Sequence, residues 1–368
     1  MNVAQIIDQL RNDAAFCRHL TAWRTFAPRP GAYASFPAAV KPDLIEGLRR
    51  RGITRLYTHQ RDAFNALEAG KHVCVVTPTA SGKTLCYNLP VLNRLLNEPH
   101  SRALYLFPTK ALSQDQVVEL TDTIETLNVK IGVYAFDGDT PASARKAVRN
   151  AGHVVVTNPD MLHAGILPHH TIWIRLFENL RYVVIDEIHH YRGVFGSHLA
   201  NVLRRLRRIC AFYGSSPQFI CCSATIANPR ELAEKLVETP VELVDNNGAP
   251  AGEKHFLFFN PPVVNRELGI RASSVKQAGR LAASLLFRNV QSIVFARSRL
   301  RVEIITTYLK EAVERKGGDP SRVRGYRGGY LPTERREIER GLRNGEVTAV
   351  VSTNALELGI DIGSLDVC

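Results

Sequence analysis

Two kinds of hydrophobic pattern alternate along most of this chain. Short, almost entirely apolar runs are separated by longer stretches in which apolar residues recur every three or four positions. The short runs lie at 73–76, 103–107, 132–136, 154–157, 182–185 and 218–222. Apolar strands separated by amphipathic helices are typical of a parallel sheet covered by helices on both faces. The pattern therefore predicts an α/β fold built on a doubly wound parallel sheet.

The same alternation starts again after a cluster of turn-forming residues at 245–252, followed by Asn260, Pro261 and Pro262. Beyond this cluster the pattern predicts helices and strands in turn. The helices lie at 275–287, 299–315 and 333–343, and the strands at 292–296, 323–326, 347–352 and 365–367. We expect a first domain at 51–245, a linker at 246–265 and a second doubly wound domain at 266–368.

Residues 1–50 have a less regular pattern. Helices are predicted at 3–10, 15–23 and 42–51, and a stretch rich in Pro, Gly and aromatic residues separates the last two. We interpret residues 1–50 as an N-terminal extension and not as a domain.

Composition narrows the class of protein. The chain has 368 residues, of which 45% are hydrophobic, so two buried cores are possible. The apolar runs are far shorter than the roughly 20 residues that a membrane span needs, and no targeting segment is evident. We expect a cytoplasmic protein with no membrane partner. The seven cysteines form no CxxC pair and are typical of reduced core thiols, and the formal charge of +12 favours a polyanionic partner.

The residues from Thr77 to Thr84 (TPTASGKT) follow a predicted strand and open a predicted helix. This is the setting of a phosphate-binding loop, in which backbone N–H groups hold phosphate oxygens. Lys83 would reach the β- and γ-phosphates, and the hydroxyl of Thr84 would bind Mg²⁺. Thr77 replaces the first glycine of the usual pattern. The loop residues expected to bind nucleotide are Thr79, Ala80, Ser81, Gly82, Lys83 and Thr84.

A second candidate site lies about a hundred residues further on, where a buried strand ends in Asp186 and Glu187. Asp186 could hold Mg²⁺, and Glu187 could orient and deprotonate the attacking water. An isolated acidic pair is also compatible with a capping loop. Together with Lys83 and Thr84, however, the pair predicts catalysis of phosphoryl transfer to water.

A glutamine precedes the phosphate-binding loop by about twenty residues. The side-chain amide of Gln60 could pair bidentately with adenine, while Tyr57 or Arg55 covers the face of the ring. An ordinary glutamine in the first turn of a helix is the alternative interpretation.

Further short runs complete an ordered series. The series comprises Gln60 and residues 77–84, 108–112, 157–162, 186–189, 223–225, 293–299 and 353–363. In this order it resembles the Q motif and motifs I, Ia, Ib, II, III, IV and V of a superfamily 2 helicase of the DExH type. Finer runs at 56–60, 79–83, 88–90 and 191–198 resemble the mitomycin repair factor A branch, which comprises bacterial and fungal DNA repair helicases that translocate 3′ to 5′.

The resemblance implies two tandem RecA-like domains that use ATP and Mg²⁺. It implies that Gly359 and Asp361 contribute to the nucleotide site, and that His189, Ser223 and Thr225 couple this site to a nucleic-acid strand. The residues expected to contact the strand are Thr109, Lys110, Thr157, Asn158, Asp160, Arg297, Arg299, Thr353 and Asn354. Family members also carry a motif VI and a cysteine-rich module beyond motif V. Since neither lies within these residues, we expect a truncated second domain and weak activity.

The function expected from the resemblance is an ATP-dependent DNA helicase or translocase acting on single-stranded or tailed duplex DNA. Two alternatives stay open. One is an RNA helicase, because no residue here predicts recognition of the 2′-hydroxyl. The other is a nucleotide-dependent binding module without unwinding. The arginine-rich stretches at 204–208 and 322–343 are more typical of solvated helix faces. The sequence does not indicate an oligomeric state.

Overall fold

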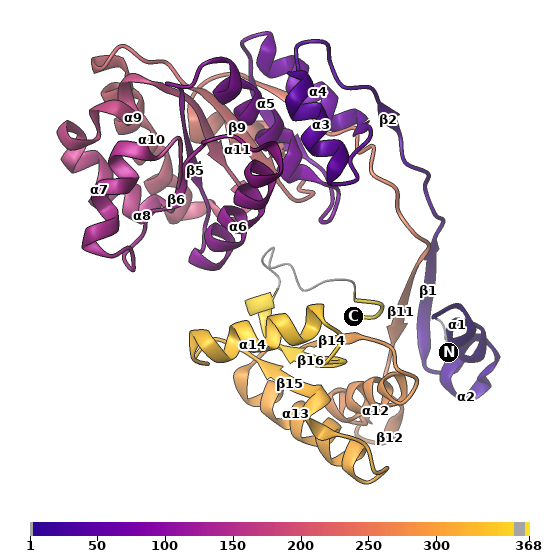
Figure 1. Ribbon diagram of the computed structural model, residues 1–368. Helices are drawn as coiled ribbons and strands as arrows, with labels where there is room; N and C mark the ends of the chain where they lie inside the picture. The colour runs from indigo at the N-terminus through magenta and orange to yellow at the C-terminus, as the bar shows by residue number, and fades with distance from the viewer. Residues whose placement is uncertain (1–2, 357–364) are drawn as a thin grey trace. The chain divides into compact units, whose positions relative to one another are not determined.

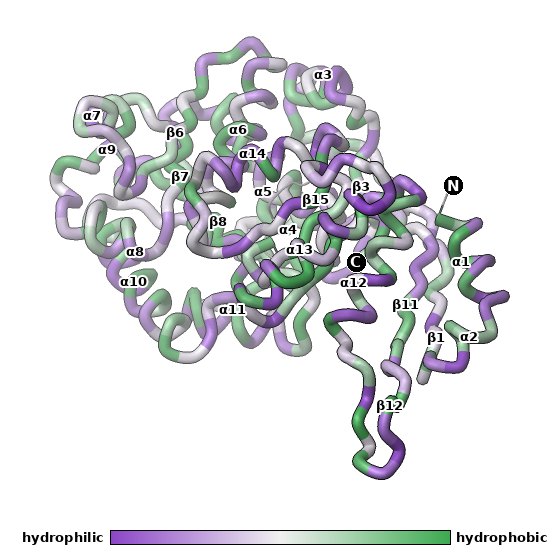
Figure 2. Tube along the Cα trace, turned by 90° about the horizontal axis from the view of Figure 1, so that it is seen from below, coloured by the Kyte–Doolittle hydropathy of each residue, from purple (hydrophilic) through white to green (hydrophobic). Residues whose placement is uncertain are grey.

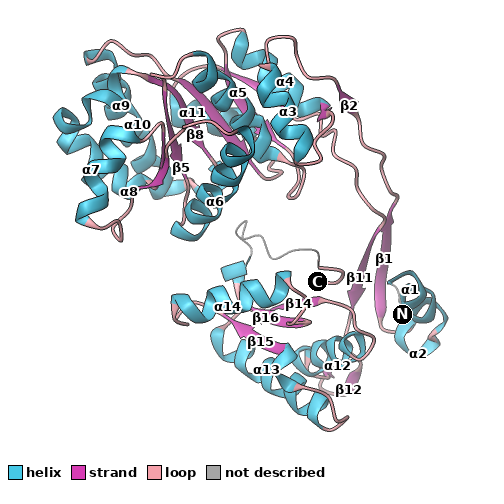
Figure 3. Ribbon diagram, viewed as in Figure 1, coloured by secondary structure: helices cyan, strands magenta, loops and turns pink. Residues whose placement is uncertain are grey.

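The computed structural model describes residues 3–356 and 365–368, and the chain forms two compact units. The first unit comprises residues 28–252, and the second comprises residues 1–27 together with 253–368. Figure 1 shows the elements of each unit, and Figure 3 shows helices on both faces of the main sheet. Within the described ranges, no helix is both long and apolar enough to span a membrane.

A parallel seven-stranded sheet forms the centre of the unit 28–252. Its strand order is β10-β4-β9-β8-β5-β7-β6. The strands are β4 (His72–Val76), β5 (Arg102–Leu106), β6 (Val133–Ala135), β7 (Val154–Thr157), β8 (Leu180–Ile185), β9 (Gln218–Ser223) and β10 (Val241–Val244). The apolar runs of the sequence form the central strands because these are buried on both faces.

Helices and short turns connect these strands. They are α3 (Pro42–Arg50), α4 (Thr58–Glu68), α5 (Lys83–Asn97), α6 (Lys110–Leu127), α7 (Ala142–Ala151), α8 (Pro159–Met161), α9 (Ile174–Glu178), α10 (Gly193–Phe212) and α11 (Pro229–Val237). A π-helix η1 (Leu162–Ile166) and the 3-10 helices η2 (Leu167–Trp173) and η3 (Ile188–His190) are also present. A two-stranded ribbon pairs β2 (Tyr33–Ala34) with β3 (Leu56–Tyr57). In Figure 2, hydrophobic and hydrophilic positions alternate along α10, as expected for a helix with one buried face.

The second unit contains a smaller parallel sheet of order β14-β16-β15. Its elements are β14 (Ser292–Phe295), β15 (Val323–Tyr326), β16 (Ala349–Ser352), α12 (Ser274–Leu286), α13 (Arg299–Glu314), α14 (Pro332–Arg343), η4 (Pro320–Arg322) and η5 (Asn354–Leu356). Val367 forms a parallel bridge to Ser292, where the sequence predicts a further strand. Two sheets of parallel strands covered by helices confirm the predicted α/β class.

The N-terminal segment joins this second unit. It comprises α1 (Val3–Asn12), α2 (Ala14–Cys17) and β1 (Leu20–Phe26), and β1 pairs antiparallel with β11 (Lys254–Phe259). Ile6 of α1 packs in one cluster with Leu285 and Val290. The helix predicted at 15–23 is correct only for its first residues, which belong to α2. From Leu20 onward it is wrong, because a strand partner more than 200 residues away overrides the local pattern. The expected extension 1–50 is thus divided between the two units.

Most of the predicted linker 246–265 is either part of a strand or hydrogen-bonded to the first unit. Residues 246–252 belong to the first unit, where the Gly248 carbonyl accepts from the Ala32 N–H at 2.8 Å. Residues 254–259 form β11, and β12 (Val263–Asn265) pairs with β13 (Ile270–Arg271). The change from one unit to the other falls at residues 252–253.

Candidate functional site

The predicted chemical groups of the first unit meet at one edge of its sheet. Strands β4, β9 and β8 are neighbours, and β5 and β7 continue the same parallel order. All their carboxyl ends therefore lie along one edge, which is where open α/β sheets bind ligands. The loops after β4, β8 and β9 carry the nucleotide motifs, and those after β5 and β7 carry the expected strand contacts.

The loop between β4 and α5 has the geometry of an anion cradle. Gly82 (φ 75°) and Ala80 (φ 59°) adopt left-handed conformations, which turn the chain sharply before α5 begins at Lys83. The hydroxyls of Thr77 and Ser81 are 2.6 Å apart and close the loop from within. The Lys83 ammonium donates to the carbonyls of Thr77 (2.8 Å) and Pro78 (2.9 Å). A bound phosphate would replace these carbonyls as the acceptor of Lys83.

Asp186 and Glu187 follow β8 directly. One Asp186 oxygen accepts from the Glu187 N–H at 2.8 Å, and the other accepts from the Tyr87 hydroxyl at 3.2 Å. Glu187 is in a left-handed conformation (φ 52°), which costs free energy for a residue with a side chain. Its buried Oε2 accepts no hydrogen bond among the described residues. An unsatisfied buried carboxylate oxygen is available to a water molecule.

Lys83, Asp186 and Glu187 lie close enough for their charges to influence one another. Burial, and then the charge of Glu187, raises the pKa of Asp186 to about 6, while Lys83 opposes this shift. Burial also raises the pKa of Glu187, and Lys83 again acts in the opposite direction. The Asp186 carboxylate and the Thr84 hydroxyl both interact with Tyr87. Together they would offer an all-oxygen set of ligands, which suits Mg²⁺. Asp186 and Thr84 would hold the ion, whose charge would relieve the repulsion between the two carboxylates.

This raised pKa predicts a stability effect of Asp186→Asn. The folded protein holds the Asp186 proton more tightly than the unfolded chain, so stability falls as pH rises from 3.8 to about 6 and stays low at pH 7. We expect Asp186→Asn to stabilise the metal-free protein at pH 7 by on the order of 2 kcal/mol. Melting temperatures in EDTA at pH 5 and pH 7 measure this. A variant less stable than wild type at pH 7 would contradict the assigned burial.

His189 connects this pair to the end of β9. Its Nδ1 lies 3.3 Å from Glu187 Oε2, 3.4 Å from the Ser223 hydroxyl and 3.4 Å from the Ala224 nitrogen. Burial lowers the pKa of His189, which keeps the ring neutral. Ser223 is fully buried, whereas Thr225 is exposed. His189 and Ser223 are thus in contact as predicted, and Thr225 lies at the surface beside them in sequence.

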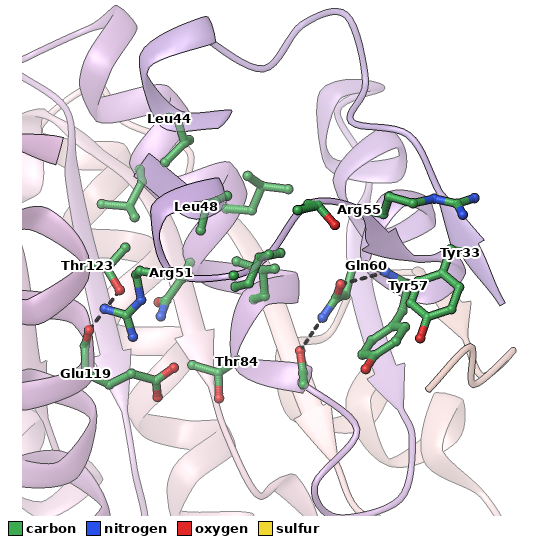
Figure 4. Close-up of a pocket in the computed structure, with 18 residues that line it drawn as sticks. Tyr33, Leu44, Leu48, Arg51, Arg55, Tyr57, Gln60, Thr84, Glu119 and Thr123 are labelled. Atoms are coloured by element: carbon green, nitrogen blue, oxygen red, sulfur yellow. Dashed lines mark hydrogen bonds between the residues drawn. The ribbon is translucent and has the colours of Figure 1, made fainter. Parts of the chain in front are cut away.

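A cavity of about 590 Å³ opens beside the phosphate-binding loop and is lined by Gln60, Tyr57, Arg55, Thr84 and Tyr33 (Figure 4). The Gln60 amide accepts from the Tyr57 N–H at 2.8 Å and donates to the Gly82 carbonyl at 2.9 Å. It therefore ties the loop to α4 and keeps one free N–H and one free lone pair for a base. Sequence reasoning missed Tyr33, whose ring centroid lies 5.4 Å from that of Tyr57 and 5.3 Å from the Arg55 guanidinium.

His59 is a second residue that sequence reasoning missed. Its fully buried ring accepts at Nδ1 from the Gly248 N–H at 3.1 Å, so its Nε2–H donates to the Ser81 carbonyl at 3.1 Å. Burial lowers the pKa of His59, in keeping with a neutral ring. The imidazole thus joins the phosphate-binding loop to the segment that leads into the second unit. The sequence signal was its place directly before Gln60.

We expect His59→Ala to weaken ATP binding by about tenfold and stability by about 2 kcal/mol, because Ser81 and Gly248 both lose a buried partner. ATP titration and thermal unfolding measure the two effects. His59→Gln, which can restore a donor to Ser81, should recover part of the affinity. Lower stability with unchanged ATP affinity in both variants would show that His59 does not position the loop.

The expected strand contacts of the first unit differ in exposure. Asp160 and Lys110 are both exposed, and Lys110 pairs with Asp139 at 2.7 Å. Thr109 and Asn158 cap α6 and α8, through Leu112 and Met161 respectively. Thr157 is only 1% exposed, and its hydroxyl donates to the Phe136 carbonyl at 2.6 Å. Its side chain therefore lies inside the sheet and not on the surface that the prediction assigned to it.

In the second unit, Arg297, Arg299 and Asn354 are exposed, and Thr353 accepts from the Ala355 N–H at 3.4 Å. These residues follow β14 and β16, at the carboxyl edge of the smaller sheet. The predicted nucleotide residues Gly359 and Asp361 lie outside the described residues.

Comparison with known proteins identifies the family. Residues 57–232 match the DEAD/DEAH box helicase family, and residues 279–368 match the helicase conserved C-terminal domain. The chain belongs to the DEAD/DEAH box helicases. The first match covers strands β4 to β9 of the main sheet, and the second covers the parallel sheet of the second unit. The family assignment confirms the predicted superfamily resemblance.

Several helicases are similar over the full length of this chain. It is 56% identical over 362 residues to the uncharacterized ATP-dependent helicase YprA of Bacillus subtilis, with 98% of this chain and 48% of that protein covered. It is 37% identical to the ATP-dependent helicase HRQ1 of Saccharomyces cerevisiae, with 99% of this chain and 34% of that protein covered. The chain thus spans half or less of the length of these relatives.

A solved structure supports the same grouping. The crystal structure of the DUF1998 helicase MrfA bound to DNA is 55% identical, with a TM-score of 0.96, and covers all of this chain and 48% of that one. MrfA bound to DNA and AMPPNP gives a TM-score of 0.95. This helicase fold confirms the RecA-like architecture that the resemblance implies.

Proposed function

We propose that this protein is an ATP-dependent DNA helicase or translocase that moves 3′ to 5′ on single-stranded DNA and acts in DNA repair. The observation that carries the proposal is the meeting of Lys83, Asp186 and Glu187 at the carboxyl edge of one sheet, in a chain of the helicase family. The similarity to MrfA, whose structures contain DNA, favours DNA over RNA.

The proposed hydrolysis uses residues with separate tasks. Mg²⁺, when bound, would neutralise phosphate charge between Thr84 and Asp186. Lys83 would exchange its carbonyl partners for phosphate oxygens. Glu187 Oε2, which accepts no hydrogen bond from the described residues, would accept one from the attacking water and take its proton. His189, which contacts both Glu187 and Ser223, would carry the change in phosphate state to the loop after β9.

The proposed strand track runs over the loops after β5 and β7, and over those after β14 and β16 in the second unit. Contacts of this kind hold the backbone without reading sequence, since phosphate and sugar are common to all nucleotides. The Thr157 hydroxyl is left out of the proposed track because it is buried. The other eight predicted residues remain as candidates for contact: Thr109, Lys110, Asn158, Asp160, Arg297, Arg299, Thr353 and Asn354.

Strand separation on tailed duplexes tests this function. With ATP and Mg²⁺, we expect a duplex with a 3′ single-stranded DNA tail to be unwound, and a blunt duplex or one with a 5′ tail to stay intact. Fluorescence of a quenched strand measures the product. Unwinding from the 5′ tail would contradict the proposed direction. Unwinding only from RNA tails would favour the RNA helicase.

A further inference from the structure

A groove separates α8 and η1 from α10 in the unit 28–252. It encloses about 710 Å³, and the residues that define its character are Asp160, His163, Phe195, His198, Arg205 and Arg208. Asp160, which lies in α8 three residues after the end of β7, is one of its lining residues. From Phe195 to Arg208 the groove follows α10 for roughly 20 Å, given the rise of a helix. The groove therefore continues from the proposed strand track along the side of the domain.

Three arginines line the groove, and two of them have no partner among the described residues. Arg204 is engaged with Glu238, to which its Nε donates at 2.7 Å. Neither Arg205 nor Arg208 has an acidic or hydrogen-bonding partner within residues 3–356 and 365–368. His198, Arg205 and Arg208 are spaced by seven and three positions, which places them on one face of α10. This face presents two guanidinium groups and an imidazole to the groove. Charges that only solvate a helix face would not need to line a groove.

The remaining features favour a nucleic-acid strand as occupant. Phe195 is 39% exposed and lines the groove, where a base could stack on its ring. The opposite wall contains the π-helix η1, an element often found at functional sites. A basic groove with an aromatic platform is the combination that binds single strands without sequence preference. Asp160 is the only acid that lines the groove in the described part of the chain.

We propose that the groove between η1 and α10 is a second contact site for single-stranded DNA, in which Arg205 and Arg208 bind phosphates and Phe195 stacks on a base. It rests on the proposed DNA helicase function and extends it, because it assigns strand binding to residues outside the helicase motifs. The groove would bind the nucleotides that continue beyond Asp160, the residue that the groove shares with the proposed strand track.

The test is single-stranded DNA binding by fluorescence anisotropy over a series of salt concentrations, with the double variant Arg205→Ala/Arg208→Ala. Each phosphate contact on a single strand contributes about 0.7 to the slope of log affinity against log salt, so the slope should fall by about 1.4. Affinity at 0.1 M salt should fall about tenfold. Phe195→Leu should weaken binding and leave the slope unchanged. ATPase activity without DNA should stay at the wild-type value in both variants.

The matched control is Arg49→Ala/Arg175→Ala, which removes two exposed charges elsewhere in the same unit. It should leave the slope and the affinity nearly unchanged. If the wild type binds single-stranded DNA, the proposed function stands. An unchanged slope in the groove variant, or an equal loss of affinity in the control, would then overturn the groove site alone. Wild-type protein that binds no single-stranded DNA would overturn the proposed function, and the groove site with it.

Discussion

Glu187→Gln protein is expected to bind Mg²⁺·ATP with nearly unchanged affinity and to hydrolyse it about a thousandfold more slowly. Glutamine keeps the size and the hydrogen-bonding oxygen of the side chain but cannot accept the proton of the attacking water. Among the described residues, one oxygen of this carboxylate accepts no hydrogen bond. The substitution therefore removes the base and leaves the phosphate-binding loop intact. Single-turnover hydrolysis and equilibrium titration with ATP measure the two effects separately.

Glu178→Gln, the same change on the exposed surface of α9, serves as the control and should hydrolyse ATP at the wild-type rate. If Glu187→Gln also hydrolysed ATP at that rate, the assigned base would be wrong. If the Glu187→Gln variant lost both ATP binding and hydrolysis, Glu187 would instead be needed to bind ATP.

Lys83→Ala is expected to lose ATP affinity by about one to two orders of magnitude and hydrolysis by more. Charge-assisted hydrogen bonds to phosphate contribute about 1.5–3 kcal/mol, and the charge that develops in the transition state adds to this. Lys83 also opposes the raised pKa values of Asp186 and Glu187, so its removal should leave the carboxylates more protonated. Binding of a fluorescent ATP analogue and steady-state hydrolysis measure the losses.

The control for Lys83→Ala is Lys130→Ala, which removes an exposed charge distant in sequence from the loop. A folded Lys83→Ala protein, verified by circular dichroism, that bound ATP as tightly as this control would contradict the phosphate-binding role of the loop.

The central strands and their motifs could be predicted because their information is local. The apolar run of β8 predicts burial on both faces, and Asp186 and Glu187 follow it in the chain. Parallel strands place the carboxyl ends of β4, β8 and β9 at one edge of the sheet. The strand pattern was therefore enough to predict that Lys83, Asp186 and Glu187 lie together. Helix α13 likewise begins at Arg299, the predicted residue.

What could not be predicted depends on contacts between distant parts of the chain. Strand β1 forms because it pairs with β11. The ten residues around Trp23 contain no sequence signal that indicates this distant partner. Tyr33 reaches the base cavity because β2 pairs with β3, and His59 contacts Gly248 across 189 positions. The buried hydroxyl of Thr157 shows the opposite case, in which a motif residue has an internal partner that its sequence neighbours do not reveal.

The most direct test of the proposed motor is the rate of ATP hydrolysis with Mg²⁺ in three reactions. These contain no nucleic acid, single-stranded DNA, or single-stranded RNA of the same sequence and length. We predict that DNA raises the rate by about tenfold, equivalent to about 1.4 kcal/mol of barrier, and that RNA raises it less. No stimulation by either strand, or greater stimulation by RNA, would contradict an ATP-driven motor that works on DNA.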